Sequence, residues 1–224
     1  MAQVVSLEEA ILKVQNGMTI MVGGFIGCGA PDQLLEAVCQ HGIKELTLIA
    51  NDTGIFGDAM SQLIVKRCVS KLIATHIGTN KETGRQMSAG ELDVKLVPQG
   101  TLVEQIRAAG AGLGGVLTPT GIGTIVEEGK RKLVVNGCEY LVELPIRADI
   151  AFLKAYKADK TGNLVYRRAA RNFNPVMAMA ADLVIVQVEH IVEVGEIDPD
   201  EVMTPSIFID YLVHKLPREV SDVG

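Results

Sequence analysis

The chain has 224 residues, with 21 lysines and arginines against 27 aspartates and glutamates, and a formal net charge of −6 at pH 7. The length fits one α/β domain over residues 1–224, and the acidic balance argues against a nucleic acid partner, because nucleic acid phosphates need a basic face. There is no charged-then-apolar leader and no uninterrupted apolar run of about 18 residues, so we expect a soluble cytoplasmic protein without a membrane partner.

The first predicted elements are a helix and a strand. Ser6 and Glu9 have the spacing of a capping box, in which each side chain accepts an N–H at the helix start, so a helix is expected over residues 7–14. Residues 19–22 are β-branched or apolar and lie between glycine-containing turns, which is typical of a central strand.

A glycine-rich loop follows this strand. Four glycines fall within residues 23–29, and Pro31 is suited by its fixed φ to the first position of a helix over residues 31–41. Glycine lets backbone N–H groups approach a ligand, and a helix start adds free donors, so we predict a cradle for an anion or a polar ligand tail. A tight turn without a ligand is the alternative. The spacing excludes the dinucleotide fingerprint, which would need glycine at Asp32, and the loop lacks the Gly-Lys-Ser/Thr triplet of nucleotide hydrolases.

Apolar strands and helical patterns then alternate along the chain. The expected strands are residues 46–50, 71–75, 94–98, 150–155 and 183–188, and the expected helices are residues 58–66, 82–89, 102–109 and 207–214. Asn136-Gly137 is a strong turn signal and predicts a small β-hairpin within residues 132–143. Apolar strands that alternate with helices predict an α/β fold with an open, mainly parallel sheet and helices on both faces.

Polar residues follow several of the predicted strands. Asn51 and Gln99 come directly after apolar segments, and the stretch from His76 to Asn80 follows another. Ligands in such sheets bind beyond the carboxyl ends of the strands, where the amides of Asn51 and Gln99 could donate to a carbonyl or a carboxylate. The alternatives are an Asx turn at Asn51 and a loop-stabilising role for Gln99.

Cys28 is a candidate nucleophile, because a thiol at a helix N-terminus is activated there. A Cys28 acyltransferase would need a base, for which His76 is the best candidate in the sequence. A small inert residue between two glycines is the favoured interpretation. The other cysteines, Cys39, Cys68 and Cys138, form no C-x-x-C pair with it, so neither a metal site nor a disulfide framework is predicted.

The remaining candidate site residues are two basic clusters and the acidic residues. Arg167, Arg168 and Arg171 form one cluster and residues 130–132 the other, and each is interpreted either as a nucleotide-phosphate site or as a solvated face. No carboxylate is singled out as a nucleophile by its spacing.

Several motifs in order resemble the first, or α, subunit of family I coenzyme A transferases. They are the run from Asn16 to Pro31, Leu48-Ile49-Ala50-Asn51-Asp52-Thr53-Gly54, His76-Ile77-Gly78-Thr79-Asn80, Val97-Pro98-Gln99-Gly100-Thr101-Leu102, Gly110-Ala111-Gly112-Leu113-Gly114-Gly115 and Asn172-Phe173-Asn174-Pro175. The resemblance covers almost the whole chain, and within the family the chain is similar to the acetate/butyrate and acetoacetate group.

The resemblance implies an enzyme of short-chain fatty acid and ketone body metabolism. It would move CoA from acetyl-CoA, butyryl-CoA or acetoacetyl-CoA to a free short-chain carboxylate, through anhydride and thioester intermediates on a glutamate of a partner β subunit. An α2β2 heterotetramer is expected, with the CoA thioester as substrate and no permanently bound cofactor.

The resemblance also implies roles for individual residues. Asn51 would contribute to the oxyanion hole, while Gln99 and Gly100 would bind the acid. The residues expected to contact CoA are Gly23, Gly24, Phe25, Ile26, Gly27, Cys28 and Gly29. Two alternatives stay open: a Cys28-dependent acyltransferase acting alone, and a non-catalytic module that binds CoA or a nucleotide.

Overall fold

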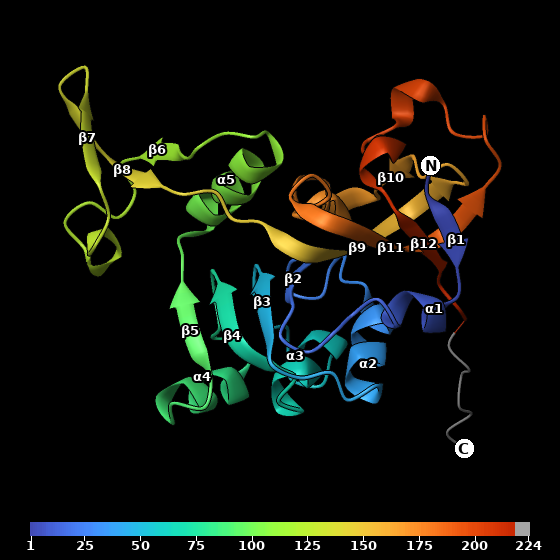
Figure 1. Cartoon of the computed structure of the whole chain (residues 1–224), viewed down its shortest axis with the longest axis horizontal. Helices are drawn as coiled ribbons and strands as arrows, with labels where there is room; N and C mark the ends of the chain where they lie inside the picture. The colour runs from blue at the N-terminus through green and yellow to red at the C-terminus, as the bar shows by residue number, and fades with distance from the viewer. Residues whose placement is uncertain (218–224) are drawn as a thin grey trace.

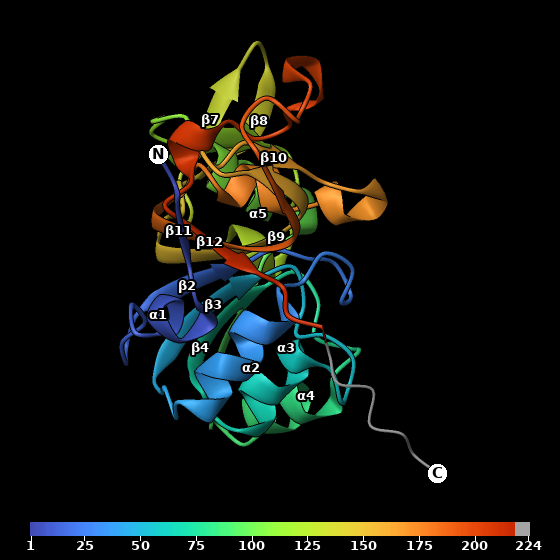
Figure 2. The same cartoon turned by 90° about the vertical axis from the view of Figure 1, so that its right-hand side faces the viewer.

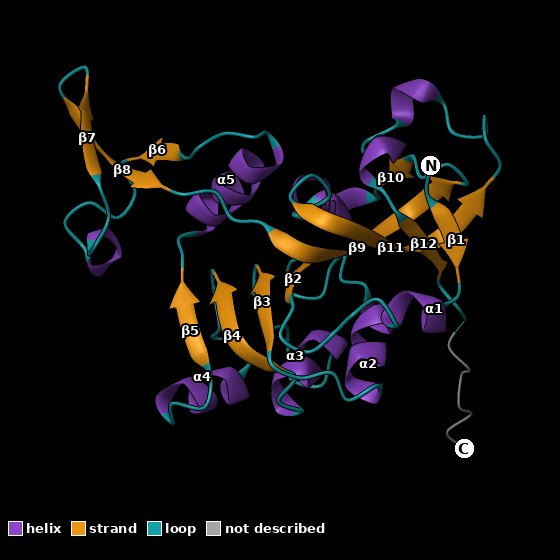
Figure 3. Ribbon diagram, viewed as in Figure 1, coloured by secondary structure: helices purple, strands orange, loops and turns teal. Residues whose placement is uncertain are grey.

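The computed structural model describes residues 1–217, and a nine-stranded sheet runs through them (Figures 1 and 3). The strands are β1 (Gln3–Val5), β2 (Thr19–Val22), β3 (Leu46–Ala50), β4 (Val69–Ala74), β5 (Asp93–Leu96), β6 (Val116–Thr118), β7 (Lys132–Val135), β8 (Cys138–Glu143), β9 (Ala148–Asp159), β10 (Leu164–Val165), β11 (Ala181–Val192) and β12 (Tyr211–His214). The α-helices are α1 (Leu7–Ile11), α2 (Asp32–Gln40), α3 (Ala59–Val65), α4 (Lys81–Ser88), α5 (Gln99–Gly110) and α6 (Asn174–Met177). None of the helices within residues 1–217 is long and apolar enough to cross a membrane.

The strand order of the main sheet confirms the predicted α/β fold. It is β1-β12-β11-β9-β2-β3-β4-β5, and neighbouring strands are parallel, while β10 pairs with β9 in the antiparallel direction. From β2 the chain builds outward through β3, β4 and β5, then returns to β9 on the other side of β2. Ligands in such sheets bind where the order reverses, which here is the loop after β2.

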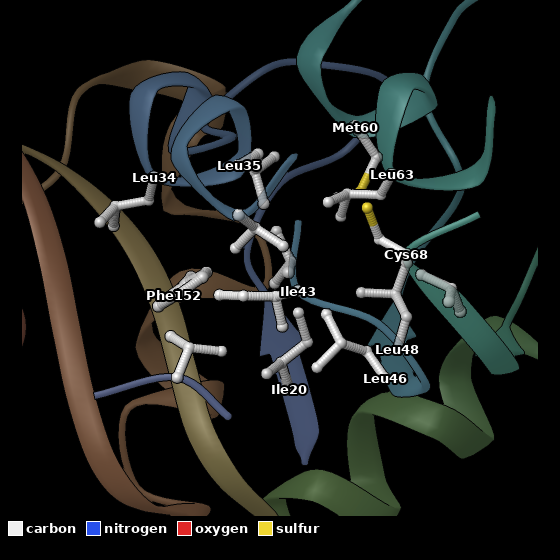
Figure 4. Packing of buried hydrophobic residues seen from close by; sticks show 14 of the residues in the cluster. Ile20, Leu34, Leu35, Ile43, Leu46, Leu48, Met60, Leu63, Cys68 and Phe152 are labelled. Atoms are coloured by element: carbon white, nitrogen blue, oxygen red, sulfur yellow. The ribbon is translucent and has the colours of Figure 1, made fainter. Parts of the chain in front are cut away.

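Alternation along the central strands produces two apolar cores. In β2, Ile20 and Val22 face the core that α1, α2 and α3 cover, whereas Met21 faces the core that α5 and α6 cover. Figure 4 shows Ile20, Leu48 and Phe152 of the sheet meeting α2 and α3, and Figure 2 shows α2 and α5 on opposite sides of it. Because both faces are buried, β2 and β3 are apolar apart from one threonine each, close to the prediction of wholly apolar strands.

The three-stranded antiparallel sheet β6-β8-β7 forms an arm that projects from the body beyond α5 (Figure 1). Its turn is the predicted one, with Asn136 and Gly137 at φ values of 53° and 79°, as a type I′ hairpin requires. The carboxylate of Glu143 is buried and accepts hydrogen bonds from Lys130 Nζ at 2.5 Å and Gln105 Nε2 at 3.1 Å, which ties the arm to α5. The sequence did not predict β6.

The structure corrects several predicted boundaries. Residues 207–214 were expected to be helical, but only 206–208 form a 3-10 turn and 211–214 form β12, between β11 and β1. The apolar side chains there suit either element, and pairing with strands far away in the sequence decides between them. The long strands β9 and β11 extend well beyond their predicted 150–155 and 183–188, and β1 was not expected.

Two prolines immediately precede helices, which changes the predicted start of each helix: α2 begins one residue later than expected, at Asp32, and α5 begins at Gln99 and not at residue 102. Pro31 is the N-cap residue of α2 and not its first helical residue. Pro98 is likewise the N-cap of α5, so Gln99 and Gly100 begin that helix and are not loop residues. The capping box of Ser6 and Glu9 is present, although α1 ends at Ile11 and not at residue 14.

Asn174, the first residue of α6, holds the glycine loop in place. Its Oδ1 accepts from Lys154 N at 3.0 Å, and its Nδ2 donates to the carbonyls of Gly29 at 3.1 Å and Ala170 at 2.9 Å. A Cβ on Gly23 would lie 1.9 Å from Asn174 Oδ1. Gly23 is therefore required by packing against a buried amide, whether or not a ligand binds.

This contact generates a prediction with a matched control. Gly23→Ala should lower the free energy of unfolding by roughly 2 to 4 kcal/mol, because Asn174 must move and give up buried hydrogen bonds. Gly84→Ala, in α4 with no atom near the added Cβ, should raise it by about 0.5 to 1 kcal/mol through helix propensity. Urea denaturation measures both changes, and equal stability of the two variants would contradict the proposed role of Asn174.

Candidate functional site

Asn51 and Gln99 meet at the carboxyl end of β3. Asn51 is 2% exposed, and its Oδ1 accepts from Gln99 Nε2 and from Thr75 Oγ1, both at 3.0 Å. An ionised carboxylate only accepts, so the amide atom that lies 2.8 Å from Asp52 Oδ2 is the donating nitrogen, and the amide oxygen is on the side of Gln99 and Thr75. The amide nitrogen carries two hydrogens, and the second has no partner among the described residues. A buried, oriented donor therefore lies at this edge of the sheet.

Asp52, to which sequence reasoning gave no role, links this amide to the glycine loop. Its Oδ2 accepts from Ile26 N and Asn51 Nδ2, and its Oδ1 accepts from Gly54 N, all at 2.8 Å. The bond to Gly54 is the Asx-turn pattern of an aspartate two residues before a turn glycine, which is a signal the sequence carries. The bond to Ile26 joins residues 26 positions apart, and no local pattern predicts it.

The tip of the glycine loop is a tight hairpin turn. Phe25 and Cys28 exchange backbone hydrogen bonds at 3.0 Å, and the two residues between them, Ile26 and Gly27, have φ values of 46° and 77°. Positive φ at both central residues defines a type I′ turn, and a β-branched residue there is strained. Phe25 and Ile26 are left about 40% exposed. The N–H groups of Gly27 and Gly29 have no partner among residues 1–217.

Cys28 lies beside basic residues and not beside His76. The thiol-bearing residue is exposed and lines a cavity of about 500 Å³ together with Lys154, Arg167 and Arg168. His76 follows β4, which is separated from β2 by β3, and its N–H donates to Asn51 O. Within the described residues no contact joins the two, so the structure does not bring together the predicted thiol and base.

The two basic clusters have different surroundings. Arg167, Arg168 and Arg171 border a cavity of about 680 Å³ that also includes Tyr156, over whose ring the Arg167 guanidinium lies 5.2 Å from the centroid. By contrast, Lys130 and Lys132 are engaged by carboxylates of the arm. Residues 1–217 contain no group of three histidine, cysteine, aspartate or glutamate side chains that could hold a metal ion.

Comparisons with known proteins cover nearly the whole chain. A family model for coenzyme A transferase matches residues 4–215. The chain is 53% identical over 211 residues to the alpha chain of the acetate CoA-transferase of Escherichia coli K12, covering 94% of this chain and 96% of that one. It is 47% identical over 212 residues to the alpha chain of the acetoacetyl-CoA:acetate/butyrate CoA transferase of Clostridium acetobutylicum, covering 95% and 97%.

A solved structure shares the fold. The acyl-CoA transferase of Escherichia coli O157:H7, in its thioester complex with CoA, matches with a TM-score of 0.85 and 22% identity, over 96% of this chain and 47% of that one. This chain spans about half the length of that solved protein. The family model and the two relatives confirm the resemblance found in the motifs, and the chain belongs to the coenzyme A transferase family.

Proposed function

We propose that this chain is the α subunit of a two-chain enzyme that moves CoA between an acyl-CoA and a free short-chain carboxylate. The acyl groups would be acetyl, butyryl or acetoacetyl, in line with the names of the two relatives. The observation that carries the proposal is the buried, oriented amide of Asn51 beside Gln99 in a chain that matches the family model almost from end to end. We further propose an α2β2 assembly in the cytoplasm.

The partner β subunit would supply the glutamate. A nucleophilic carboxylate must reach the thioester carbonyl, and the carboxylate near Asn51 belongs to Asp52. That residue is 4% exposed, and its carboxylate already accepts three hydrogen bonds. It therefore stabilises the loops and is not available as a nucleophile. Around Asn51 the described residues thus offer hydrogen-bond donors without a free carboxylate, which is what half of a shared site would contain.

In the proposed reaction the residues at the carboxyl edge of the sheet have separate roles. The free N–H of Asn51 would donate to the carbonyl oxygen as it becomes an oxyanion, which is worth more at a dry, preorganised site than in water. Gln99 and Gly100 would bind the carboxylate of the acid. The N–H groups of Gly27 and Gly29 without a partner among residues 1–217 would contact CoA, because both glycines border the cavity that Cys28 lines. CoA would take part as a substrate, with nothing bound permanently.

The first prediction of this proposal concerns which of the two chains carries the catalytic glutamate. The chain alone should not transfer CoA from acetoacetyl-CoA to acetate, and adding its β subunit should restore transfer with ping-pong kinetics. Borohydride reduction during turnover, followed by mass mapping, should locate the modified glutamate in the partner. A modified glutamate found in this chain, with none in the partner, would refute the proposal.

The second prediction concerns Asn51. In the assembled enzyme, Asn51→Ala should lower kcat by about a hundred- to a thousandfold, or roughly 3 to 4 kcal/mol, the usual cost of one oxyanion donor. Asn16→Ala is the control, because that amide accepts from Lys44 N at the opposite end of β2. Steady-state kinetics on both variants make the comparison, and similar rates for the two would remove Asn51 from the reaction.

The third prediction distinguishes CoA transfer through the partner's glutamate from catalysis by the Cys28 thiol. Cys28→Ala should change the rate by less than about tenfold, because His76 is not beside the thiol and the Glu189 carboxylate in the same cavity is ion-paired with Lys154 at 3.1 Å. An inactive Cys28→Ala enzyme that still assembles would instead support a cysteine acyltransferase. Binding of CoA esters by calorimetry, without transfer in the presence of the β subunit, would support a non-catalytic module.

A further inference from the structure

Cys39 and Cys68 contact each other near the amino ends of the inner strands, away from the candidate site. Cys39 lies in the last turn of α2 and Cys68 directly precedes β4, and their Sγ atoms are 3.9 Å apart. Cys68 is buried beside Leu63 of α3 (Figure 4), whereas Cys39 is partly exposed. The two residues are 29 positions apart in the sequence, so no local spacing indicates the pair.

Two lysines lie near the two sulfurs. The Lys44 ammonium donates to the carbonyl of Lys66, which is two residues before Cys68. The pKa of the Cys68 thiol is lowered to about 7 by its hydrogen bond with Cys39 and by the charges of Lys44 and Lys66, against the effect of burial. Near neutral pH about half of the molecules therefore carry one proton and one negative charge on the two sulfurs.

These surroundings differ from those of an inert core cysteine. A thiol in purely apolar surroundings ionises less readily than in water, whereas partly exposed thiols beside cationic groups are reactive. Residues 1–217 contain no third ligand that would make the pair a metal site. A disulfide, by contrast, needs only that the two sulfurs approach to a bond length of about 2 Å. Cys39 lies where a helix end frays, so its side chain can make that movement.

We propose that Cys39 and Cys68 form a reversible intramolecular disulfide when the chain meets a hydroperoxide. Cys39 reacts first, because it is the partly exposed one. Its sulfur attacks a peroxide oxygen and becomes a sulfenic acid, while the O–O bond breaks, hydroxide leaves and the Cys39 proton passes to Cys68. The Cys68 sulfur then attacks that of Cys39, and the S–O bond breaks as the hydroxyl leaves with the Cys68 proton as water. One peroxide is thus reduced by two electrons, and the two thiols are oxidised by two.

The disulfide would join the end of α2 to the segment before β4. It would close a loop of roughly 30 residues, which stabilises the folded chain by restricting the unfolded one. Thiol–disulfide exchange with a small dithiol would reverse it. Asn51 and Gln99 lie at the carboxyl edge of the sheet, so the bond does not occupy the candidate site. The inference does not rest on the function proposed above, and its tests need no transfer of CoA.

The bond is tested by mass mapping of the full chain. The chain is treated with a small excess of hydrogen peroxide, free thiols are blocked with N-ethylmaleimide, and trypsin is added without reduction. Trypsin cleaves after Lys44 and Arg67, so the peptides of Cys39 and Cys68 stay together only if a disulfide joins them. We expect this linked pair in most molecules and its loss on adding dithiothreitol. Cysteines 39 and 68 that both remain free to alkylation, or that are linked to other cysteines, would overturn the proposal.

Single substitutions test whether the two sulfurs react as a pair. In Cys39→Ala and in Cys68→Ala the remaining thiol should be oxidised by peroxide about tenfold or more slowly than the wild-type pair, because Cys68 is buried and Cys39 loses the sulfur that takes its proton. Cys138→Ser is the matched control, since it removes an exposed thiol outside the pair and should leave the rate within about twofold. Equal rates in wild type and in the two alanine variants would overturn the proposal.

Thermal unfolding provides a measurement that needs no variant. The oxidised wild-type chain should have a Tm about 5 °C or more above that of the reduced chain, because the closed loop restricts the unfolded state. Dithiothreitol should return the Tm to its original value. An unchanged or lower Tm in chains shown by mass to carry the bond would mean that the native core is distorted by it, and would overturn the inference that the folded geometry is ready for this bond.

Discussion

The buried carboxylate of Asp52 is the contact on which the geometry of the carboxyl edge depends. It accepts from the glycine loop at Ile26, from the amide of Asn51 and from Gly54 in its own turn. Bonds from N–H groups to a charged carboxylate are stronger than neutral ones, and they offset the strain of an isoleucine at positive φ. Without this carboxylate the loop tip would lose its anchor, and the Asn51 amide would lose the partner that fixes its direction.

How far the sequence predicts this structure depends on the range of the interaction involved. The inner strands and their helices follow from apolar runs, capping residues and turn glycines, all of which are local signals. β12 and β1 could not be found in this way, because β12 pairs with β11 on one side and, on the other, with a strand from the far end of the chain. Taken alone, the YLVH sequence at residues 211–214 is compatible with a helix, and pairing with β11 and β1 makes it a strand.

The candidate site likewise combines features that local sequence signals predict with features that depend on packing between distant residues. Asn51 and Gln99 were predicted from their positions after apolar strands, because parallel strands bring their carboxyl ends to one edge. Their direct hydrogen bond, the clamp by Asn174 and the role of Asp52 depend on how loops pack, which periodicity does not encode. Gly23 illustrates the limit most clearly. Its presence in a glycine-rich motif suggests ligand contact, yet the structure shows that a neighbouring amide already excludes a Cβ there.

The arm is joined to α5 by a buried hydrogen bond. One turn after Thr101, Gln105 donates to the buried Glu143, so the helix that begins at the site is hydrogen-bonded to the strand that carries β6 on its edge. Gln99, at the start of the same helix, donates to Asn51, so α5 links the arm to the candidate site. Because Gln99 begins the helix whose Gln105 is bonded to the arm, a displacement of the arm would be transmitted through α5 to the amide that orients Asn51.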